Sequence, residues 1–220
     1  MRTSASAAAE QMDKIYRYQR YFYDATRRHF LLGRDTLVAG LVPPDGGTVV
    51  EIGCGTARNL IQTAVSYPNA KLYGFDISNA MLKTARGKIE AAGLSNRIRV
   101  EQGDATNFNL QRLFGFARAD RIVASYTLSM IPQWHEAIAC ACPQLSSNGS
   151  LHIVDFGPMS GLPSITKLGL HGWLAKFSVH PSDTLEREVR LAATAHGLDA
   201  YVAHPFRGYA TYAVLTAPRA

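Results

Sequence analysis

Val49-Val50-Glu51-Ile52-Gly53-Cys54-Gly55-Thr56-Ala57-Arg58 is the stretch that decides the fold. A strand-like apolar run leads into a turn with two glycines, and a helical pattern follows the turn. Gly53 and Gly55 allow the backbone to approach a bound ligand closely. A dinucleotide site would need glycine where Arg58 stands, and Glu51 places a negative charge where phosphates would lie. The turn therefore predicts a cationic ligand.

Strand-like segments alternate with helical segments on both sides of this turn. Such alternation predicts parallel strands joined by right-handed crossovers. The expected fold class is α/β, a doubly wound, Rossmann-like sheet of seven strands, whose last two strands form an antiparallel hairpin turned at residues 205–208. Strands are predicted at residues 48–52, 71–75, 98–102, 121–124, 151–155, 199–204 and 209–216, and helices at 8–30, 34–41, 57–66, 78–92, 132–145 and 184–196.

The composition is that of one folded domain, with 47% hydrophobic and 18% charged residues. No apolar run reaches the roughly 18 residues that span a bilayer, and the N-terminus lacks the apolar core of a secretion signal, so a cytoplasmic protein is expected. Three cysteines without a CxxC pair indicate a reducing compartment and no metal site. The net charge of +6 suits an anionic partner, either nucleic acid or an acidic lipid surface.

Polar residues follow three further strands of the expected sheet. Asp76 ends the second strand, where a carboxylate can accept hydrogen bonds from both ribose hydroxyls. Asp104 follows the third strand and suits an adenine amino group, and Ser125 and Tyr126 follow the fourth. All of these positions are carboxyl ends of strands, which is the edge where open α/β sheets bind ligands.

This pattern resembles the class I S-adenosylmethionine-dependent methyltransferases over residues of about 48–157. Glu51, Gly53 and Gly55 match the family's first motif, and Ala57 replaces its last glycine. The resemblance implies S-adenosyl-L-methionine as cofactor and S-adenosyl-L-homocysteine as product, with Asp76 at the ribose. The expected cofactor contacts are Tyr23, Arg34, Glu51, Gly53, Cys54, Gly55, Thr56, Asn59, Asp76, Ile77, Met81, Gly103, Asp104, Ala105, Ser125 and Tyr126.

Further segments are similar to the betaine-lipid N-methyltransferases of the BtaB type. They are residues 13–20, 23–27, 31–35, 125–132, 155–157 and 177–181. This resemblance implies an amine-bearing lipid substrate, diacylglycerylhomoserine, whose amine would receive three methyl groups. Methylation of phosphatidylethanolamine, of another small amine or of a quinone-like lipid stays open, as does a non-catalytic regulatory protein that binds the cofactor. The fourth strand lacks the Asn/Asp-Pro-Pro-aromatic pattern of base methylation and the basic residues are scattered, so nucleic acid is not expected as a partner.

Residues 1–45 are predicted to form a helical lid or substrate segment, and residues 46–220 the cofactor-binding domain, within a single structural domain. Tyr16 and Tyr23 lie seven positions apart and so share one face of the predicted first helix. Aromatic rings there suit a product with a fixed positive charge. We expect Tyr23 and Arg34 to contact the methionine part of the cofactor.

An alkylammonium substrate must lose a proton before it can accept a methyl group. Water, Tyr126, His135 or Asp155 could accept that proton, and the sequence does not choose among them. The residues predicted to be catalytic are Tyr126, Tyr23 and Asp155.

Residues 162–177 combine leucines, Trp173 and Phe177 with Lys167, His171 and Lys176, and contain no acidic residue. This composition predicts an interfacial helix that contacts an anionic membrane surface, placing the protein peripherally on the inner face of a membrane. A lid helix or a core helix is an equally consistent interpretation. The sequence leaves the oligomeric state open.

Overall fold

The computed structural model describes residues 31–176 and 179–218. The helix predicted over residues 8–30, with Tyr16 and Tyr23, lies outside the described residues, as do residues 177–178. Within the described part of the chain, no helix is both long enough and apolar enough to cross a bilayer.

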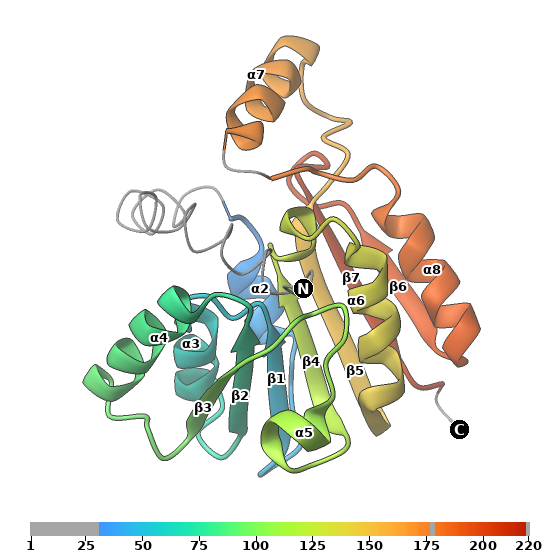
Figure 1. The fold of residues 1–220 in the computed structure, drawn as a ribbon. Helices are drawn as coiled ribbons and strands as arrows, with labels where there is room; N and C mark the ends of the chain where they lie inside the picture. The colour runs from blue at the N-terminus through green and yellow to red at the C-terminus, as the bar shows by residue number, and fades with distance from the viewer. Residues whose placement is uncertain (1–30, 177–178, 219–220) are drawn as a thin grey trace, which may run out of the picture.

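A seven-stranded sheet forms the centre of the molecule (Figure 1). Its strands are β1 (Thr48–Ile52), β2 (Lys71–Asp76), β3 (Ile98–Gln102), β4 (Ala119–Ser125), β5 (Leu145–Phe156), β6 (Asp199–Ala203) and β7 (Ala210–Thr216). The spatial order is β3-β2-β1-β4-β5-β7-β6, in which β1 to β5 pair in parallel and β7 runs antiparallel to both of its neighbours. The predicted fold class and the antiparallel C-terminal hairpin are confirmed.

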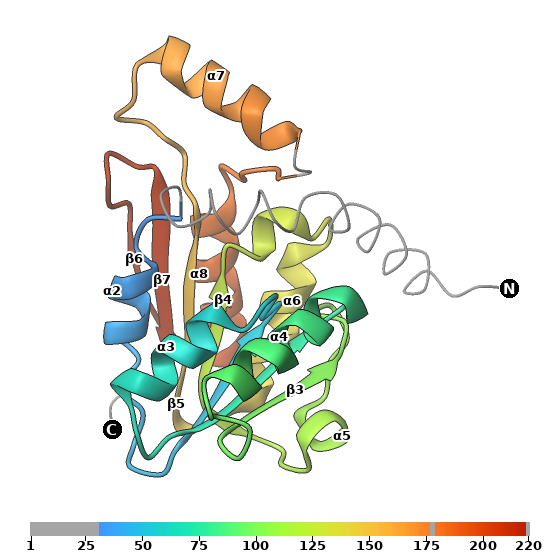
Figure 2. The same ribbon diagram turned by 90° about the vertical axis from the view of Figure 1, so that its left-hand side faces the viewer.

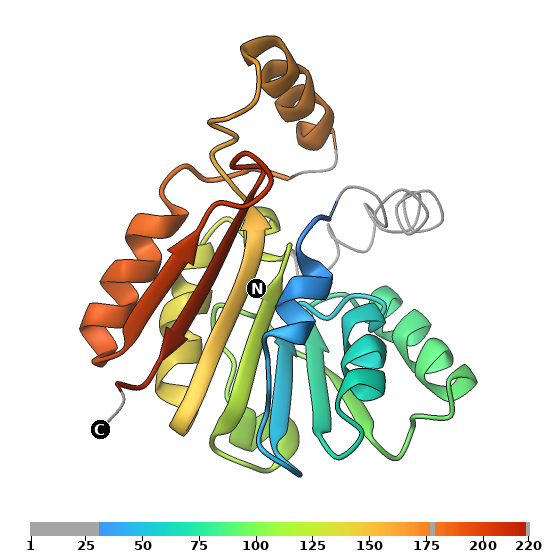
Figure 3. The same cartoon turned by 180° about the vertical axis from the view of Figure 1, so that it is seen from behind.

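Helices cover both faces of the sheet (Figure 3). One face carries α2 (Arg34–Ala39), α3 (Arg58–Ser66) and α4 (Asn79–Ala91), and the other carries α5 (Leu110–Phe114), α6 (Trp134–Ala141) and α8 (Leu185–His196). Two short 3-10 helices, η1 (Leu128–Met130) and η2 (Cys142–Gln144), follow β4 and α6. The helix α7 (Ser164–Ala175) stands beyond the carboxyl ends of the strands (Figure 2).

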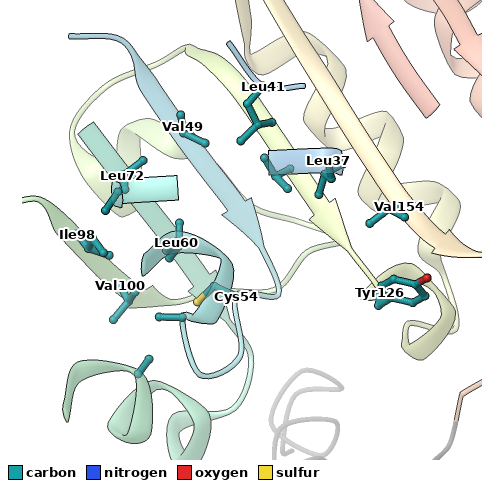
Figure 4. Close-up of a cluster of buried hydrophobic side chains, with 14 of the residues drawn as sticks. Leu37, Leu41, Val49, Cys54, Leu60, Leu72, Ile98, Val100, Tyr126 and Val154 are labelled. Atoms are coloured by element: carbon teal, nitrogen blue, oxygen red, sulfur yellow. The ribbon is translucent and has the colours of Figure 1, made fainter. Parts of the chain in front are cut away.

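The period-two alternation of the strands divides the apolar residues between two cores. In β1, Val49 packs under α2 and α3, whereas Val50 and Ile52 face α5 and α6. Leu37 and Leu41 join the first core from the α2 segment, as Figure 4 shows. The division of the chain at residue 45 stays a prediction.

Several elements differ from the sequence-based expectation, most by one or two residues at their ends. The strand β5 begins at Leu145 instead of residue 151, and α6 ends at Ala141 before a 3-10 turn that contains Pro143, which has no N–H to continue an α-helix. The five-residue helix α5 was not predicted. A helix is present within residues 162–177 as α7, whose bounds are Ser164–Ala175, and its contact with a membrane stays a prediction.

Candidate cofactor site

The turn after β1 has a left-handed backbone, which glycine adopts more readily than other residues. Gly53, Gly55 and Ala57 have φ of 61°, 52° and 62°, all in the left-handed region. A Cβ atom on Gly53 would lie 2.3 Å from Thr127 Oγ1, and that hydroxyl donates a hydrogen bond to the carbonyl oxygen of Gly53 at 3.2 Å. Thr127, which lies just beyond the end of β4, therefore fixes the turn that follows β1.

Asp76, at the end of β2, connects the glycine turn to the start of α4. Its buried carboxylate accepts a hydrogen bond from Gly55 N at 2.9 Å and another from Ser78 N at 2.9 Å. The hydroxyl of Ser78 caps α4 by accepting from Met81 N at 3.3 Å. Two backbone amides thus orient the carboxylate at the edge where the ribose acid was predicted.

Glu51 and Asn59 form a buried polar pair beside the turn. Asn59 Nδ2 donates to Glu51 Oε1 at 2.7 Å, which links the end of β1 to the first turn of α3. Asn59 Oδ1 and Ser125 Oγ are buried and have no hydrogen-bond partner among the described residues. Buried polar atoms of this kind usually await a ligand or water, so they fit a polar group bound at this place.

These residues surround a cavity of about 150 Å³. Its lining consists of Leu31, Arg34, Glu51, Gly53, Cys54, Gly55, Thr56, Arg58, Asn59, Lys88 and Ser125. Ligand pockets usually measure roughly 300 to 1,000 Å³, so this cavity accounts for only part of a nucleoside cofactor.

The charges around the cavity suit a zwitterionic amino-acid group. Glu51 offers a carboxylate, whereas Arg34, Arg58 and Lys88 offer cations. Lys88 Nζ donates to Thr56 Oγ1 at 3.2 Å, which brings α4 against the glycine turn. An ammonium and a carboxylate on one ligand would both find opposite charges here.

The cavity brings together Arg34, Glu51, Gly53, Cys54, Gly55, Thr56, Asn59 and Ser125 from the predicted contacts. It does not include Asp76, Ile77, Met81, Gly103, Asp104, Ala105 or Tyr126 in its lining. Asp104 instead accepts hydrogen bonds from the N–H and the hydroxyl of Thr106, at 2.9 and 2.7 Å. Two further hydrogen bonds join the ends of β2 and β3. Gly103 N donates to Asp76 O, and Gln102 Nε2 donates to Ile77 O. The role of each residue as a cofactor contact stays a prediction.

Sequence reasoning did not select Leu31, Arg58 or Lys88 as site residues. Arg58 was noted only as a side chain too large for a dinucleotide turn. Lys88 reaches the cavity from α4, 32 positions from its partner Thr56, and no local pattern indicates such a contact.

Burial raises the pKa of the Cys54 thiol well above its usual value, and the negative charges of Asp76 and Glu51 add to the shift. The thiol is therefore protonated at neutral pH and is not a nucleophile. Among the residues described, no group of three or more His, Cys, Asp or Glu side chains is arranged to hold a metal ion.

Tyr126 and Asp155, two of the predicted catalytic residues, are buried and do not belong to the lining of the cavity. Tyr126 OH donates to Leu32 O at 2.7 Å, and burial raises its pKa, so it is a neutral donor. Asp155 accepts from Ser129 N at 3.1 Å and from Phe156 N at 2.8 Å, and burial raises its pKa. The third predicted residue, Tyr23, lies outside the described residues. The catalytic roles of all three stay predictions.

The hydrogen bonds of these two residues join the segments that resemble betaine-lipid enzymes. Tyr126 binds residues 31–35 and Asp155 binds η1, while His180 N donates to Ser129 O at 2.8 Å. Segments far apart in the sequence thus meet at one edge of the sheet.

Residues 44–185 match the family model described as a methyltransferase domain. The chain belongs to this family. The resemblance to class I S-adenosylmethionine-dependent methyltransferases is confirmed at that level, and S-adenosylmethionine is the cofactor of this methyltransferase domain. Nothing in the comparisons indicates a betaine-lipid enzyme.

Two curated relatives show how broad the family is. The carboxy-S-adenosyl-L-methionine synthase of Wolinella succinogenes is 36% identical over 108 residues, which cover 48% of this chain and 41% of that protein. The tRNA1(Val) (adenine(37)-N6)-methyltransferase of Porphyromonas gingivalis is 27% identical over 117 residues, covering 50% and 46%. This methyltransferase domain thus spans less than half the length of these relatives.

Solved structures confirm the fold. An O-methyltransferase family protein from Burkholderia thailandensis matches with a TM-score of 0.70 and 20% identity, covering 90% of this chain and 59% of that one. Phosphoethanolamine N-methyltransferase 2 of Haemonchus contortus, in complex with S-adenosyl-L-methionine, matches with a TM-score of 0.68 and 14% identity, covering 84% and 52%.

Proposed function

We propose that this protein transfers methyl groups from S-adenosylmethionine to the amine of a lipid headgroup, with diacylglycerylhomoserine as substrate. One observation carries the first half of the proposal. The glycine turn and the Glu51–Asn59 pair line one cavity at the carboxyl edge of the sheet, and the Asp76 carboxylate accepts a hydrogen bond from Gly55 of that turn. That is the edge where α/β sheets bind nucleosides.

When bound, the cofactor would supply a methyl carbon that the lone pair of the neutral amine attacks in line with the carbon–sulfur bond, and the sulfur would leave as the thioether of S-adenosylhomocysteine. The chain's own residues bind and orient the reactants. Glu51 and Arg34 would hold the amino and carboxylate groups of the methionine part, and Asp76 would hold the ribose. Tyr126 has a positioning role, because its hydrogen bond to Leu32 fixes the segment that carries Arg34 over the cavity.

The lipid half of the proposal is supported by the segments similar to betaine-lipid N-methyltransferases. Four of them, around residues 31–35, 125–132, 155–157 and 179–181, are joined by hydrogen bonds beside the cavity. The first three supply Leu32, Tyr126 and Asp155, and the last reaches Ser129 through His180. An amine held near this cluster would face the cofactor cavity from the open edge of the sheet.

The proposal is tested by measuring methyl transfer from labelled S-adenosylmethionine to three separate acceptors. These are diacylglycerylhomoserine in detergent, phosphatidylethanolamine in detergent, and tRNA. We expect label in the homoserine lipid. Glu51→Gln should lower kcat/KM by about ten- to a hundredfold, since a charge-assisted hydrogen bond contributes roughly 1.5 to 3 kcal/mol. The matched control is Glu90→Gln, which changes an exposed glutamate on α4 and should leave the rate unchanged.

The three acceptors separate the alternatives. Label in phosphatidylethanolamine alone would show that the proposed headgroup is wrong and that the substrate is still a lipid amine. Label in tRNA alone would overturn the assignment of a lipid substrate. Binding of S-adenosylhomocysteine without transfer to any acceptor would indicate a regulatory protein. Loss of cofactor binding in the parent protein would overturn the proposal as a whole.

A further inference from the structure

The helix α7 presents an apolar face to solvent. Ile165 is 82% exposed and Leu168 is 75% exposed, although both are large aliphatic side chains. They lie three positions apart and so share one side of the helix, together with the exposed Gly169, Gly172 and Lys176. The opposite side packs onto the core through Leu174, which is 2% exposed.

The turn between β6 and β7 is joined to the loop that leads into α7. Phe206 is 47% exposed and is followed by the exposed Arg207. Three backbone hydrogen bonds of 2.7 to 3.0 Å connect residues 157–161, which lead into α7, to residues 207–209 of the turn. The turn and α7 therefore form one unit beyond the carboxyl ends of the strands (Figures 1 and 2).

The charges of this unit have a single sign. Residues 157–182 contain no aspartate or glutamate, and their only charged residues are Lys167 and Lys176. Lys167 Nζ donates to Pro158 O at 2.7 Å, so its side chain fastens α7 to the preceding loop. The exposed cations of the face are thus Lys176 and Arg207.

We infer that this face, formed by Ile165, Leu168, Lys176, Phe206 and Arg207, docks the protein on an anionic lipid bilayer. Exposed aliphatic and aromatic side chains with flanking cations and no acids are the pattern of an interfacial helix on acidic lipid. The chemistry fits this occupant better than a protein partner, because the exposed apolar side chains are accompanied by Lys176 and Arg207, and residues 157–182 contain no acidic residue. The inference extends the proposed function, since a docked protein would receive a lipid headgroup at the edge that carries the cofactor cavity.

The structure changes which side chains are expected to contact lipid. The sequence-based prediction of membrane contact rests on the leucines and Trp173 of residues 162–177. In the structure, Leu174 belongs to the core beneath α7, and Trp173 is partly buried against it. A charge at Leu174 would disturb folding and would not report on docking.

Flotation of the full chain with vesicles of equal phosphatidylglycerol and phosphatidylcholine tests the inference. Binding is expected to these vesicles and to be weak on phosphatidylcholine alone. The double variant Ile165→Glu/Leu168→Glu should lower the partition coefficient at least about tenfold, because two apolar side chains leave the interface. Lys176→Gln and Arg207→Gln should each lower it about fivefold, which corresponds to roughly 1 kcal/mol per cation.

The matched control is the double variant Val65→Glu/Leu191→Glu. It changes two exposed aliphatic residues, 75% and 56% exposed, on α3 and α8. This control should float like the parent. Equal loss in both double variants, or no binding by the parent, would overturn the inference. A third outcome would also overturn it: the parent protein forms a dimer, and the Ile165→Glu/Leu168→Glu variant dissociates that dimer but floats like the parent. The face would then be a contact between two copies of the chain.

Methyl transfer to detergent-dispersed substrate separates this inference from the proposed function. The Ile165→Glu/Leu168→Glu variant should keep the parent rate on that substrate and lose rate on substrate in anionic vesicles. If the parent protein floats with anionic vesicles but transfers no methyl group, only the proposed function is wrong. If it transfers methyl groups to the detergent-dispersed substrate but does not float, only the docking face is wrong.

Discussion

Gly53 is required by both its backbone and its neighbour. Its φ of 61° disfavours any side chain, and an added Cβ would lie 2.3 Å from Thr127 Oγ1. We expect Gly53→Ala to lower the free energy of unfolding by about 2 to 4 kcal/mol. Roughly 1 kcal/mol comes from the left-handed backbone and about 1 to 3 from overpacking. Urea unfolding measures the change.

Gly93→Ala is the control for that prediction. Gly93 has a similar φ of 69°, but an added Cβ would meet nothing within 4 Å. We expect a loss of only about 1 kcal/mol there. Equal losses in the two variants would show that Thr127 does not constrain the turn.

His152 should make the stability of the fold depend on pH. Its ring is buried in β5, with Nε2 2.8 Å from Ser150 Oγ, and burial lowers its pKa from 6.5 to about 4, with a further contribution from Arg121. The unfolded chain takes up this proton below about pH 6.5 and the folded chain only near pH 4. The free energy of unfolding should therefore decrease by on the order of 3 kcal/mol as the pH is lowered from about 6.5 to about 4.

Urea unfolding of the parent and of His152→Gln, at intervals from pH 7.5 to pH 4, checks this expectation. Glutamine does not titrate, so the variant should lack this part of the acid-induced loss. Two profiles that stay parallel over the whole range would contradict the role given to His152.

Residues of the site differ in how well sequence predicts them. Glu51, Gly53 and Gly55 stand in one local pattern whose physical meaning is clear, because the turn must pass close to a ligand. Arg58 and Lys88 reach the same cavity through the placement of α3 and α4, and that placement depends on packing across the whole sheet face. The spacing of residues along the chain therefore does not predict that Arg58 and Lys88 reach the cavity.

At the scale of elements, α4 contains a glycine with no structural use. Gly87 lies within the helix Asn79–Ala91 and is exposed, and an added Cβ would meet nothing within 4 Å. Gly87→Ala should raise the free energy of unfolding by about 0.5 to 1 kcal/mol, because alanine loses less backbone entropy in a helix. Thermal or urea unfolding will measure this.

Gly74→Ala provides the opposite case within the same fold. Gly74 lies in β2, where an added Cβ would come within 2.6 Å of Leu60 Cδ1 and 2.8 Å of Cys54 Cβ. That variant should lose stability. If both alanine variants shifted in the same direction, local packing would not explain the two glycines.

The strands could be predicted because buried, β-branched runs end at clear turns. The start of β5 could not, because Ser146, Ser147 and Asn148 have the composition of a loop. The strand begins at Leu145 because Leu145 pairs with Ala119 of β4, and residues 146–149 form a bulge before pairing resumes between Ser150 and Arg121. A tertiary contact thus overrides local propensity, as is common for strands.

At the scale of the whole molecule, the carboxyl edge of the sheet carries two features on neighbouring strands. The cavity is lined by residues that follow β1 and β4. The helix α7 and the turn between β6 and β7, which carry the proposed docking face, stand beyond the end of β5 and the start of β7 (Figure 3). Because β4 and β5 are adjacent, a headgroup at the face would need to move across only this one edge to reach the cavity. The fold therefore allows lipid contact and methyl transfer to occur on the same side of the molecule.

Cofactor binding should stabilise the molecule as a whole. A ligand at a hundred times its Kd adds about 2.7 kcal/mol, which for a chain of this size raises Tm by roughly 5 to 10 °C. S-adenosylhomocysteine should produce this shift in the parent and in Asp199→Asn, an exposed position at the start of β6. Asp76→Asn should lose most of the shift. The carboxylate accepts from two backbone amides and is predicted to accept from two ribose hydroxyls as well, whereas an amide side chain has only one acceptor oxygen. The comparison uses the shift and not Tm itself, since Asp76→Asn also weakens the turn without ligand. A full shift in Asp76→Asn would remove Asp76 from the ribose site and leave the glycine turn as the only anchor for the nucleoside.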